Sequence, residues 1–263
     1  MKRLLESVNL EYGYDFRNYA WPSLSRMLIH AMNKMDCLTL LDLQKKILQN
    51  SEHFYDFIQL ITIPVSHFFR DPSYFLSLRE KVIPYLKTFP SLKIWVAGCS
   101  TGEEVYSLAI LLQEEKLLKR TTMYATDINP RSLEKAQQGI FDLKTIQMAI
   151  PQYQKAGGKK AFTDYYTIVL HSAKFHEKLK ENVIFTDHSL ATDAVFSETH
   201  LISCRNVLIY FNSELQERVI NLFYDSLCRK GFLGLGHRET IHFSKCAKHF
   251  DLVAKESQIF QKK

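Results

Sequence analysis

The chain has 263 residues, 46% of them hydrophobic and 24% charged, which is ordinary for a globular protein and allows one large domain or two smaller ones. The formal net charge of +6 is modest, and the basic residues are dispersed, so a nucleic-acid partner is not indicated. No apolar run approaches the roughly 20 residues of a membrane span, no signal peptide follows Met1, and five scattered cysteines without CxxC spacing indicate reduced thiols and a cytoplasmic protein.

The first 70 residues are predicted to be helical. Apolar residues repeat with helical spacing between Leu24 and Met35, and again between Leu40 and Leu48. No glycine occurs between Gly13 and Gly98, and no strand-like alternation is found. We therefore predict a helical domain over residues 1–70 that caps a larger domain over residues 71–263.

An arginine lies at the junction of these two regions. Asp71 followed by Pro72 predicts a helix start, with Asp71 as the N-cap, and this helix is expected to run to about Val82. The preceding pair of phenylalanines favours core packing. Arg70, between aromatic residues and a helix start, is typical of an arginine that binds a specific anion.

A strand, a glycine turn and a helix follow one another in the centre of the chain. Residues 93–97 form a short apolar run, Gly98 and Gly102 interrupt it, and apolar residues then recur with helical spacing from Val105 to Leu112. Such a turn in an open α/β sheet is where a nucleotide-like ligand binds. The spacing fits neither a dinucleotide fingerprint nor a P-loop.

Two glutamates begin the helix after this turn. Glu103 and Glu104 occupy the position where a phosphate would bind, so the ligand is expected to be neutral or cationic there. The alternative is that both glutamates only complement the helix dipole. A second strand over residues 122–126 ends at Asp127, a position from which a carboxylate accepts hydrogen bonds from a ribose, although a plain turn aspartate is the alternative.

The remaining elements complete an α/β fold. Residues 141–181 are predicted to be an irregular insertion with a small antiparallel element that includes a strand over 164–170. Further strands are expected over residues 182–185, 200–204 and 232–236, with a helix that starts at residue 212 or 213 and ends before Lys230. A closing hairpin over residues 250–254 and 257–260 predicts a mostly parallel sheet with an antiparallel edge.

Four motifs carry a resemblance to a known family: Phe68-Phe69-Arg70, Gly98-Cys99-Ser100-Thr101-Gly102-Glu103-Glu104, Ala125-Thr126-Asp127-Ile128 and Cys204-Arg205-Asn206-Val207-Leu208-Ile209-Tyr210-Phe211. In this order and spacing they resemble the CheR-type chemotaxis methyltransferases, which use S-adenosylmethionine to methylate glutamate side chains of chemoreceptors. The resemblance covers the chain from about residue 60 to the end. It implies a helical N-terminal domain, then a class I, Rossmann-like methyltransferase domain with a small β-subdomain at residues 141–181.

The resemblance also implies roles for individual residues. The cofactor-binding set it implies is Ser66, Arg70, Gly98, Glu103, Asp127, Ser189, Leu190, Arg205 and Asn206. Within that set Asp127 would bind the ribose. Arg70 and Tyr210 would face the substrate carboxylate, and these two are the candidate catalytic residues. Two departures from the family pattern are Pro64 and Ser189, which stand where asparagine is usual.

The chemistry implied by the resemblance suits the residues present. A glutamate acceptor is ionised at neutral pH, with a reference pKa of about 4.3, so methyl transfer to it needs no general base. The chain shows no metal-ligand spacing, and Cys204 has no activating base. The partner implied is a chemoreceptor or similar signalling protein, with no nucleic acid, no membrane insertion and a monomeric enzyme.

Three other functions stay open at this point. A methyltransferase of the same fold could act on another acceptor, and a regulatory module could bind the cofactor without turnover. A nicotinamide-dependent dehydrogenase is disfavoured by the glycine spacing.

Overall fold

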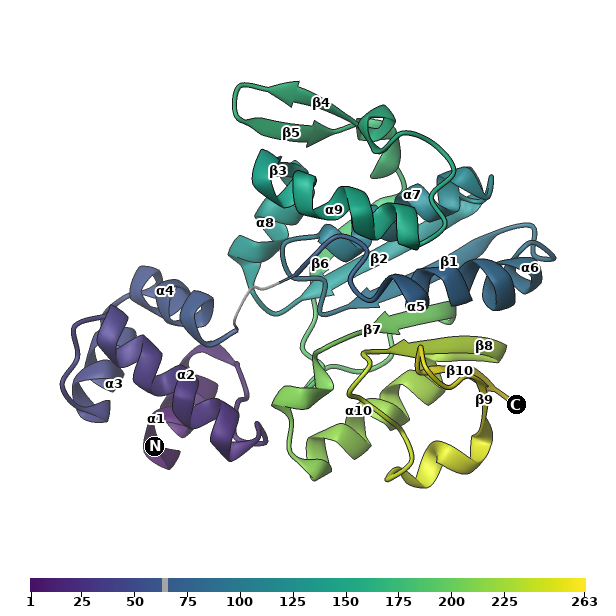
Figure 1. Cartoon of the computed structure of the whole chain (residues 1–263). Helices are drawn as coiled ribbons and strands as arrows, with labels where there is room; N and C mark the ends of the chain where they lie inside the picture. Colours follow the sequence, from purple (N-terminus) through teal and green to yellow (C-terminus); the bar gives the residue numbers. More distant parts are fainter. Residues whose placement is uncertain (63–65) are drawn as a thin grey trace.

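The computed structural model describes residues 1–62 and 66–263 (Figure 1). The departure at Pro64 therefore lies outside the described residues. Four helices open the chain: α1 (Lys2–Tyr12), α2 (Trp21–Lys34), α3 (Leu40–Gln49) and α4 (Ser51–Ile61). A capping box formed by Thr39 and Asp42 begins α3, and the Asn50 side chain caps α4. These helices, here called the helical segment, confirm the predicted helices; the domain boundary at residue 70 stays a prediction.

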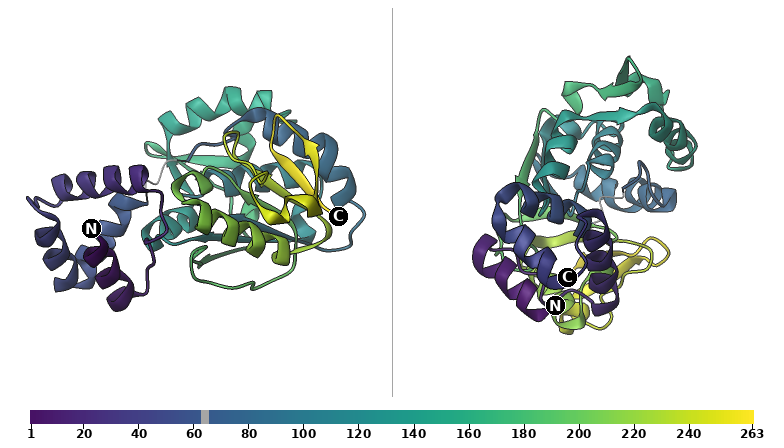
Figure 2. Two further views of the ribbon diagram at one scale, coloured as in Figure 1. Left: turned by 90° about the horizontal axis from the view of Figure 1, so that it is seen from below. Right: turned by 90° about the vertical axis from the view of Figure 1, so that its left-hand side faces the viewer.

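The helical segment has its own apolar core. Its buried side chains come from all four helices and include Leu28, Ile47 and Phe57. Figure 2 shows the segment at one end of the molecule and the C-terminus at the other. One of its contacts with the rest of the chain lies in and just after α4, where Asn129 donates to Thr62 at 2.8 Å and Arg131 pairs with Asp56 at 2.5 Å.

A seven-stranded sheet forms the centre of the molecule, in the order β6-β2-β1-β7-β8-β10-β9. The strands are β1 (Leu92–Ala97), β2 (Thr121–Asp127), β6 (Val183–Asp187), β7 (Thr199–Cys204), β8 (Leu227–Leu235), β9 (Phe250–Ala254) and β10 (Ile259–Lys262). The first five in this order are parallel, and β10 and β9 are antiparallel. The predicted α/β class and the antiparallel C-terminal edge are confirmed.

Strand β1 explains why helices cover both faces of the sheet. Its alternate residues Ile94 and Val96 enter one core, and Trp95 and Ala97 enter the other, because successive side chains of a strand point to opposite faces. In the first core, four helices pack on the sheet: α5 (Pro72–Ser77), α6 (Ile83–Leu86), α7 (Glu103–Glu114) and α8 (Pro130–Gln138). In the second core, α10 (Ser213–Ser226) packs on the opposite face of the sheet.

The insertion contains more regular structure than predicted. It comprises β3 (Ile140–Asp142), α9 (Leu143–Lys155), β4 (Tyr166–Val169) and β5 (Ser172–Phe175). The three strands pair antiparallel in the order β3-β5-β4, which confirms the small antiparallel element, seen at the top of Figure 1. The expectation of an irregular stretch before it was wrong, because Asp142 caps the 13-residue helix α9.

Three expected element boundaries also differ from the structure. Asp71 is not a side-chain cap: it adopts a left-handed conformation with φ of 54°, and its carboxylate pairs with Arg205 instead. The helix after it continues beyond Val82 to Leu86 through a π-helical turn over Leu78–Val82. Strand β8 begins at Leu227 rather than at residue 232, because α10 ends at Ser226. The remaining short helical turns are Leu118–Arg120, Phe162–Tyr165, Glu177–Leu179, Leu208–Tyr210 and Lys245–His249.

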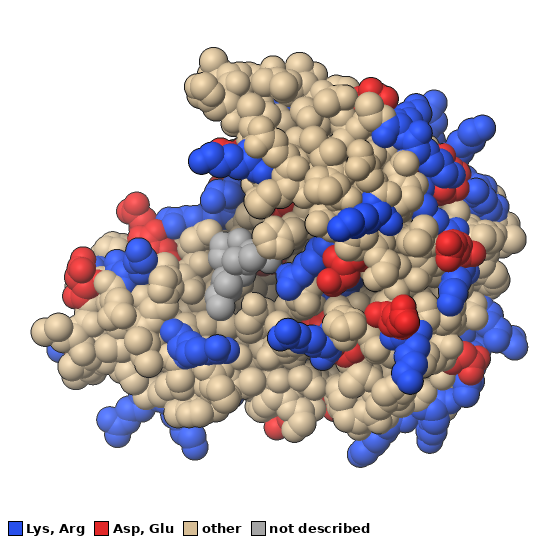
Figure 3. Space-filling view, in the orientation of Figure 1, with Lys and Arg blue, Asp and Glu red and all other residues tan. Residues whose placement is uncertain are grey.

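The surface carries no concentrated charge on the face shown in Figure 3. Lys and Arg side chains are scattered over it among Asp and Glu, as the dispersed basic residues of the sequence predicted. None of the helices in the described ranges is both long and apolar enough to cross a membrane.

Candidate active site

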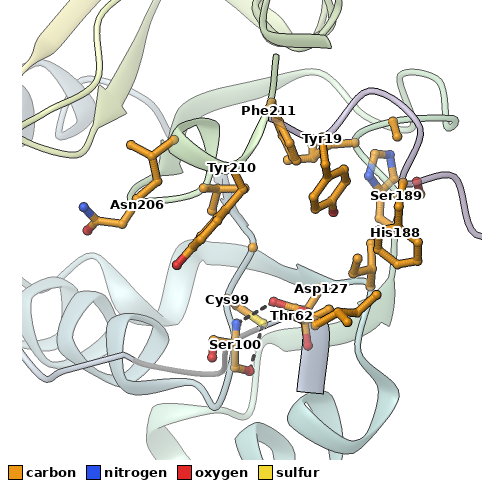
Figure 4. A pocket seen from close by; sticks show the side chains of 18 of the residues that line it. Tyr19, Thr62, Cys99, Ser100, Asp127, His188, Ser189, Asn206, Tyr210 and Phe211 are labelled. Carbon is orange, nitrogen blue, oxygen red and sulfur yellow. Dashed lines mark hydrogen bonds between the residues drawn. The ribbon is translucent and has the colours of Figure 1, made fainter. Parts of the chain in front are cut away.

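A cavity of about 370 Å³ opens at the carboxyl ends of the parallel strands (Figure 4). After β1 the chain adds β2 and then β6 on one side of β1 in the sheet. It then returns to add β7 and β8 on the other side of β1, so the order in which strands are added reverses at β1. In open α/β sheets ligands bind outside such a reversal. The volume is within the range of small-molecule and cofactor sites.

Most of the residues predicted for the site come together here. The predicted residues that line the cavity are Ser66, Arg70, Gly98, Asp127, Ser189, Leu190, Arg205, Asn206 and Tyr210. Their roles in binding and catalysis stay predictions. Glu103 does not line the cavity.

The glycine turn forms the floor of the cavity. Gly98 has a φ of 73° and Gly102 a φ of 95°, a region that favours glycine. A side chain at Gly98 would also meet Val207 at 2.5 Å, and one at Gly102 would meet Ala136 at 2.9 Å. Both positions therefore need glycine for conformation and for space.

Asp127 lies at the tip of β2 and is held by backbone amides. Its Oδ2 accepts from the Ser100 N–H at 2.8 Å and its Oδ1 from the Asn129 N–H at 2.9 Å. Burial raises the pKa of Asp127 above its ordinary value, although these hydrogen bonds act to lower it. The carboxylate keeps further lone pairs that can accept from ribose hydroxyl groups.

The two glutamates of the turn have different positions. Thr101 Oγ1 lies 2.9 and 2.7 Å from the two carboxylate oxygens of Glu103, which is only 7% exposed. Glu104 lines the cavity and accepts from Ser203 Oγ at 2.6 Å and from Arg205 Nη1 at 2.9 Å. Glu104, which was not among the predicted site residues, therefore lines the cavity, and the cofactor-binding role of Glu103 stays a prediction.

Arg205 connects the end of β7 to the segment that carries Arg70. Its Nη2 donates to the Arg70 carbonyl at 2.7 Å and to Asp71 Oδ2 at 2.8 Å, and its guanidinium lies 4.2 Å from the centre of the Tyr74 ring. With Glu104 on Nη1, most of its donors are used within the protein. Among the described residues, the Arg70 side chain itself makes no hydrogen bond or ion pair, and it lines the cavity half-buried.

Aromatic residues of the helical segment close the opposite side of the cavity, and the sequence did not predict them. Tyr14, Phe16 and Tyr19 lie between α1 and α2 and line the cavity with Tyr210. In Figure 4 the rings of Tyr19 and Tyr210 extend from one side toward Asp127 and Ser100 on the other. The spacing of three aromatics between two helices is the one sequence signal that could have marked them.

Short backbone contacts hold these aromatics in place. Tyr19 forms an isolated antiparallel bridge with Phe211, and their rings meet edge to face at 5.1 Å. The Ala20 N–H donates to the Tyr210 carbonyl at 2.8 Å. The stretch that carries Tyr210 therefore makes a second contact with the helical segment.

The cavity suits a ligand with both polar and apolar parts. Among the described residues, four cavity-lining side chains have a buried polar atom without a hydrogen-bond partner: Ser100 Oγ, His188 Nδ1, Arg205 Nε and Asn206 Oδ1. His188, which follows β6, was also missed by the sequence. Aromatic rings and carboxylates complete the wall, and both favour a cationic group. A nucleoside linked to a sulfonium, as in S-adenosylmethionine, fits this set of polar, acidic and aromatic groups, and the roles of the individual residues stay predictions.

Comparison with known proteins gives the family. The family model described as "CheR methyltransferase, SAM binding domain" matches residues 64–259. The chain is 51% identical to the Pseudomonas putida protein Cher3 over 262 residues, covering all of this chain and 96% of that protein.

Two further relatives are named "Chemotaxis protein methyltransferase". The one from Listeria monocytogenes is 31% identical, over 89% of this chain and 87% of that protein. The one from Salmonella typhimurium is also 31% identical, over 78% of this chain and 69% of that protein. The chain belongs to the CheR family of chemotaxis-type methyltransferases and uses S-adenosylmethionine as its cofactor.

Proposed function

We propose that this protein transfers a methyl group to the side-chain carboxylate of glutamate in a chemoreceptor or a related signalling protein. The family and the names of the Listeria and Salmonella relatives support this acceptor. The observation that carries the proposal is that Arg70 and Tyr210 line the same cavity as Asp127. A half-buried guanidinium without a partner among the described residues is suited to a carboxylate.

The proposed reaction requires no acid–base catalysis by the protein. S-adenosylmethionine supplies the methyl group: its S–C bond breaks as an O–C bond forms to the carboxylate, and neutral S-adenosylhomocysteine remains. No proton moves, so no general base is required for an acceptor that is already ionised.

Positioning and exclusion of water then account for the rate. Orienting the carboxylate oxygen correctly supplies roughly 7–11 kcal/mol. Arg70 offsets part of the cost of removing the acceptor from water. The Tyr210 hydroxyl offers a weaker hydrogen bond that orients the carboxylate without withdrawing its nucleophilic charge.

The acceptor is tested with tritiated S-adenosylmethionine. The protein is incubated with the signalling domain of a chemoreceptor, either intact or with its methylation-site glutamates replaced by alanine. We expect label only on the intact domain, released as volatile methanol by mild alkali, because a carboxyl methyl ester is base-labile.

The other outcomes identify the alternatives. Label that survives alkali would mean a different acceptor chemistry. Binding of S-adenosylhomocysteine without any transfer to protein would mean a regulatory module, and either result would contradict the proposal.

A further inference from the structure

A buried carboxylate outside the predicted site contacts the segment that carries Tyr210. Glu239 follows β8 and is only 4% exposed. Its Oε2 accepts from the Asn206 N–H at 2.8 Å and from the Gly236 N–H at 2.7 Å, and its Oε1 accepts from the Ile209 N–H at 3.3 Å. Across the described ranges Glu239 makes no ion pair, so its carboxylate is stabilised by hydrogen bonds from backbone amides.

The amides that it binds belong to an irregular stretch of backbone. Asn206 has a φ of 62°, in the left-handed region, and the chain then enters the short turn Leu208–Tyr210. Amides in such a segment lack the partners that a helix or sheet would provide. Because an ionised acceptor makes stronger hydrogen bonds than a neutral one, Glu239 fixes this segment more firmly than a neutral side chain could.

The packing around the carboxylate is tight. A side-chain carbon added at Gly236 would lie 2.6 Å from Glu239 Oε2 and 2.8 Å from Asn206 Nδ2. Burial raises the pKa of Glu239, and the amide hydrogen bonds oppose that rise. The end of β8, the carboxylate and the Asn206 segment therefore form one close-packed unit beside the cavity.

We propose that Glu239 is a positioning residue for methyl transfer: it holds the backbone from Asn206 to Ile209 so that Asn206 and Tyr210 face the cofactor cavity. It acts through this backbone and does not line the cavity itself. The inference rests on the proposed function for the role of Tyr210. A neutral amide cannot replace the carboxylate, because its NH₂ group would face a backbone N–H.

The test compares three variants: Glu239→Gln, Glu239→Asp and a control, Glu115→Gln. Glu115 is another buried carboxylate, 8% exposed, which pairs with Arg79 and does not line the cavity. We expect E239Q to lower kcat about 100-fold, the effect of moving a reacting group by about 1 Å. Affinity for S-adenosylhomocysteine should fall less than kcat does.

The other two variants separate positioning from stability. E239D keeps the charge on a shorter side chain, so it should recover part of the kcat that E239Q loses. E115Q should lower the melting temperature while its kcat stays within about twofold of the native value. Equal losses of kcat in E239Q and E115Q, or a native kcat in E239Q, would overturn the proposal.

Amide exchange gives a readout that does not depend on the acceptor. In E239Q the Asn206 and Ile209 amides should exchange with solvent faster than in the native protein, while the sheet amides of β1 keep their protection. If the native protein methylated no glutamate, the proposed function would fail, but this exchange pattern would still support the positioning role. Unchanged protection of both amides would contradict it.

Discussion

The two sides of the cofactor cavity are built in different ways. On the sheet side, charged groups hold sharply turned backbone: Asp127 accepts from the Ser100 amide, and Arg205 joins Glu104 to Asp71. On the side of the helical segment, aromatic rings cover the cavity, and the Tyr19–Phe211 bridge and the Ala20–Tyr210 hydrogen bond hold them.

This difference separates two tasks. Charged groups in fixed positions select and orient a ligand, because their hydrogen bonds are directional and costly to leave unmade. Aromatic rings add apolar contact and keep water out, with less demand on exact geometry. We therefore expect substitutions on the sheet side to have larger effects than those on the helical side.

Replacing Asp127 should have the largest effect. In Asp127→Ala the ribose loses an ionised acceptor, and two charge-assisted hydrogen bonds of about 2 kcal/mol each correspond to a roughly thousandfold loss of affinity for S-adenosylhomocysteine. Calorimetric titration of both proteins measures this. An affinity within tenfold of the native value would mean that the sheet side does not hold the ribose through Asp127.

The pH dependence of binding refines this prediction. Because the pKa of Asp127 is raised, its neutral form appears at a higher pH than that of an exposed aspartate. The neutral form is a poorer acceptor, so affinity should weaken as the pH falls through this raised pKa. Asp127→Asn, which cannot ionise, should bind weakly with little dependence on pH over the same range.

A conservative change at Arg205 should have the next largest effect. Lysine in Arg205→Lys cannot make the forked contacts to Glu104 and Asp71 while lying on the Tyr74 ring. Loss of about 2 kcal/mol of charged hydrogen bonding should lower kcat/KM roughly 30-fold. Steady-state kinetics measures this, with Arg120→Lys as the matched control, because Arg120 donates to the Phe89 and Lys87 carbonyls and does not line the cavity.

The residues on the sheet side of the cavity were largely predictable, because the sequence patterns that mark them involve residues close together in the chain. Gly98 and Gly102, and Asp127 followed by Asn129, each mark a turn through neighbouring residues. The two glutamates could not be told apart locally, because both begin the same helix; the contacts of Glu104 with Ser203 and Arg205 come from a distant part of the sequence.

The helical side could not be predicted in the same way. Tyr19 reaches the cavity because its backbone pairs with Phe211, almost 200 residues later in the sequence. No periodicity or turn signal encodes such a contact. The prediction of Asp71 as a helix cap was wrong for the same reason: its partner, Arg205, is distant in the sequence, and Asp71 adopts a left-handed conformation while paired with it.

A substitution on the helical side should have a smaller effect. Tyr19→Ala removes one aromatic wall, and a loss of about 1 kcal/mol corresponds to a roughly fivefold weaker binding of S-adenosylhomocysteine. Tyr55→Ala is the matched control, because Tyr55 belongs to the same segment but is 39% exposed and does not line the cavity. A Tyr19 effect as large as that of Asp127 would break the distinction between the two sides.

The smallest effect on binding is expected at Glu115, which follows the C-terminal end of α7 and does not line the cavity. Its carboxylate pairs with three cations: Arg79 at 2.9 Å, Lys87 at 2.9 Å and Lys159 at 2.5 Å. Burial acts to raise the pKa of Glu115, but these hydrogen bonds outweigh burial and lower it from 4.5 to about 2.

A group with a lowered pKa contributes stability that is present above its unfolded value and is lost as the pH falls through the folded value. Glu115→Gln should therefore lower the melting temperature by about 5 °C at pH 7, and the difference from the native protein should narrow between pH 4.5 and pH 2. Thermal unfolding followed across this range measures it, and binding of S-adenosylhomocysteine at pH 7 should stay native. A loss of affinity in this variant would show that ligand binding depends on the general stability of the protein rather than on the charged contacts of the sheet side.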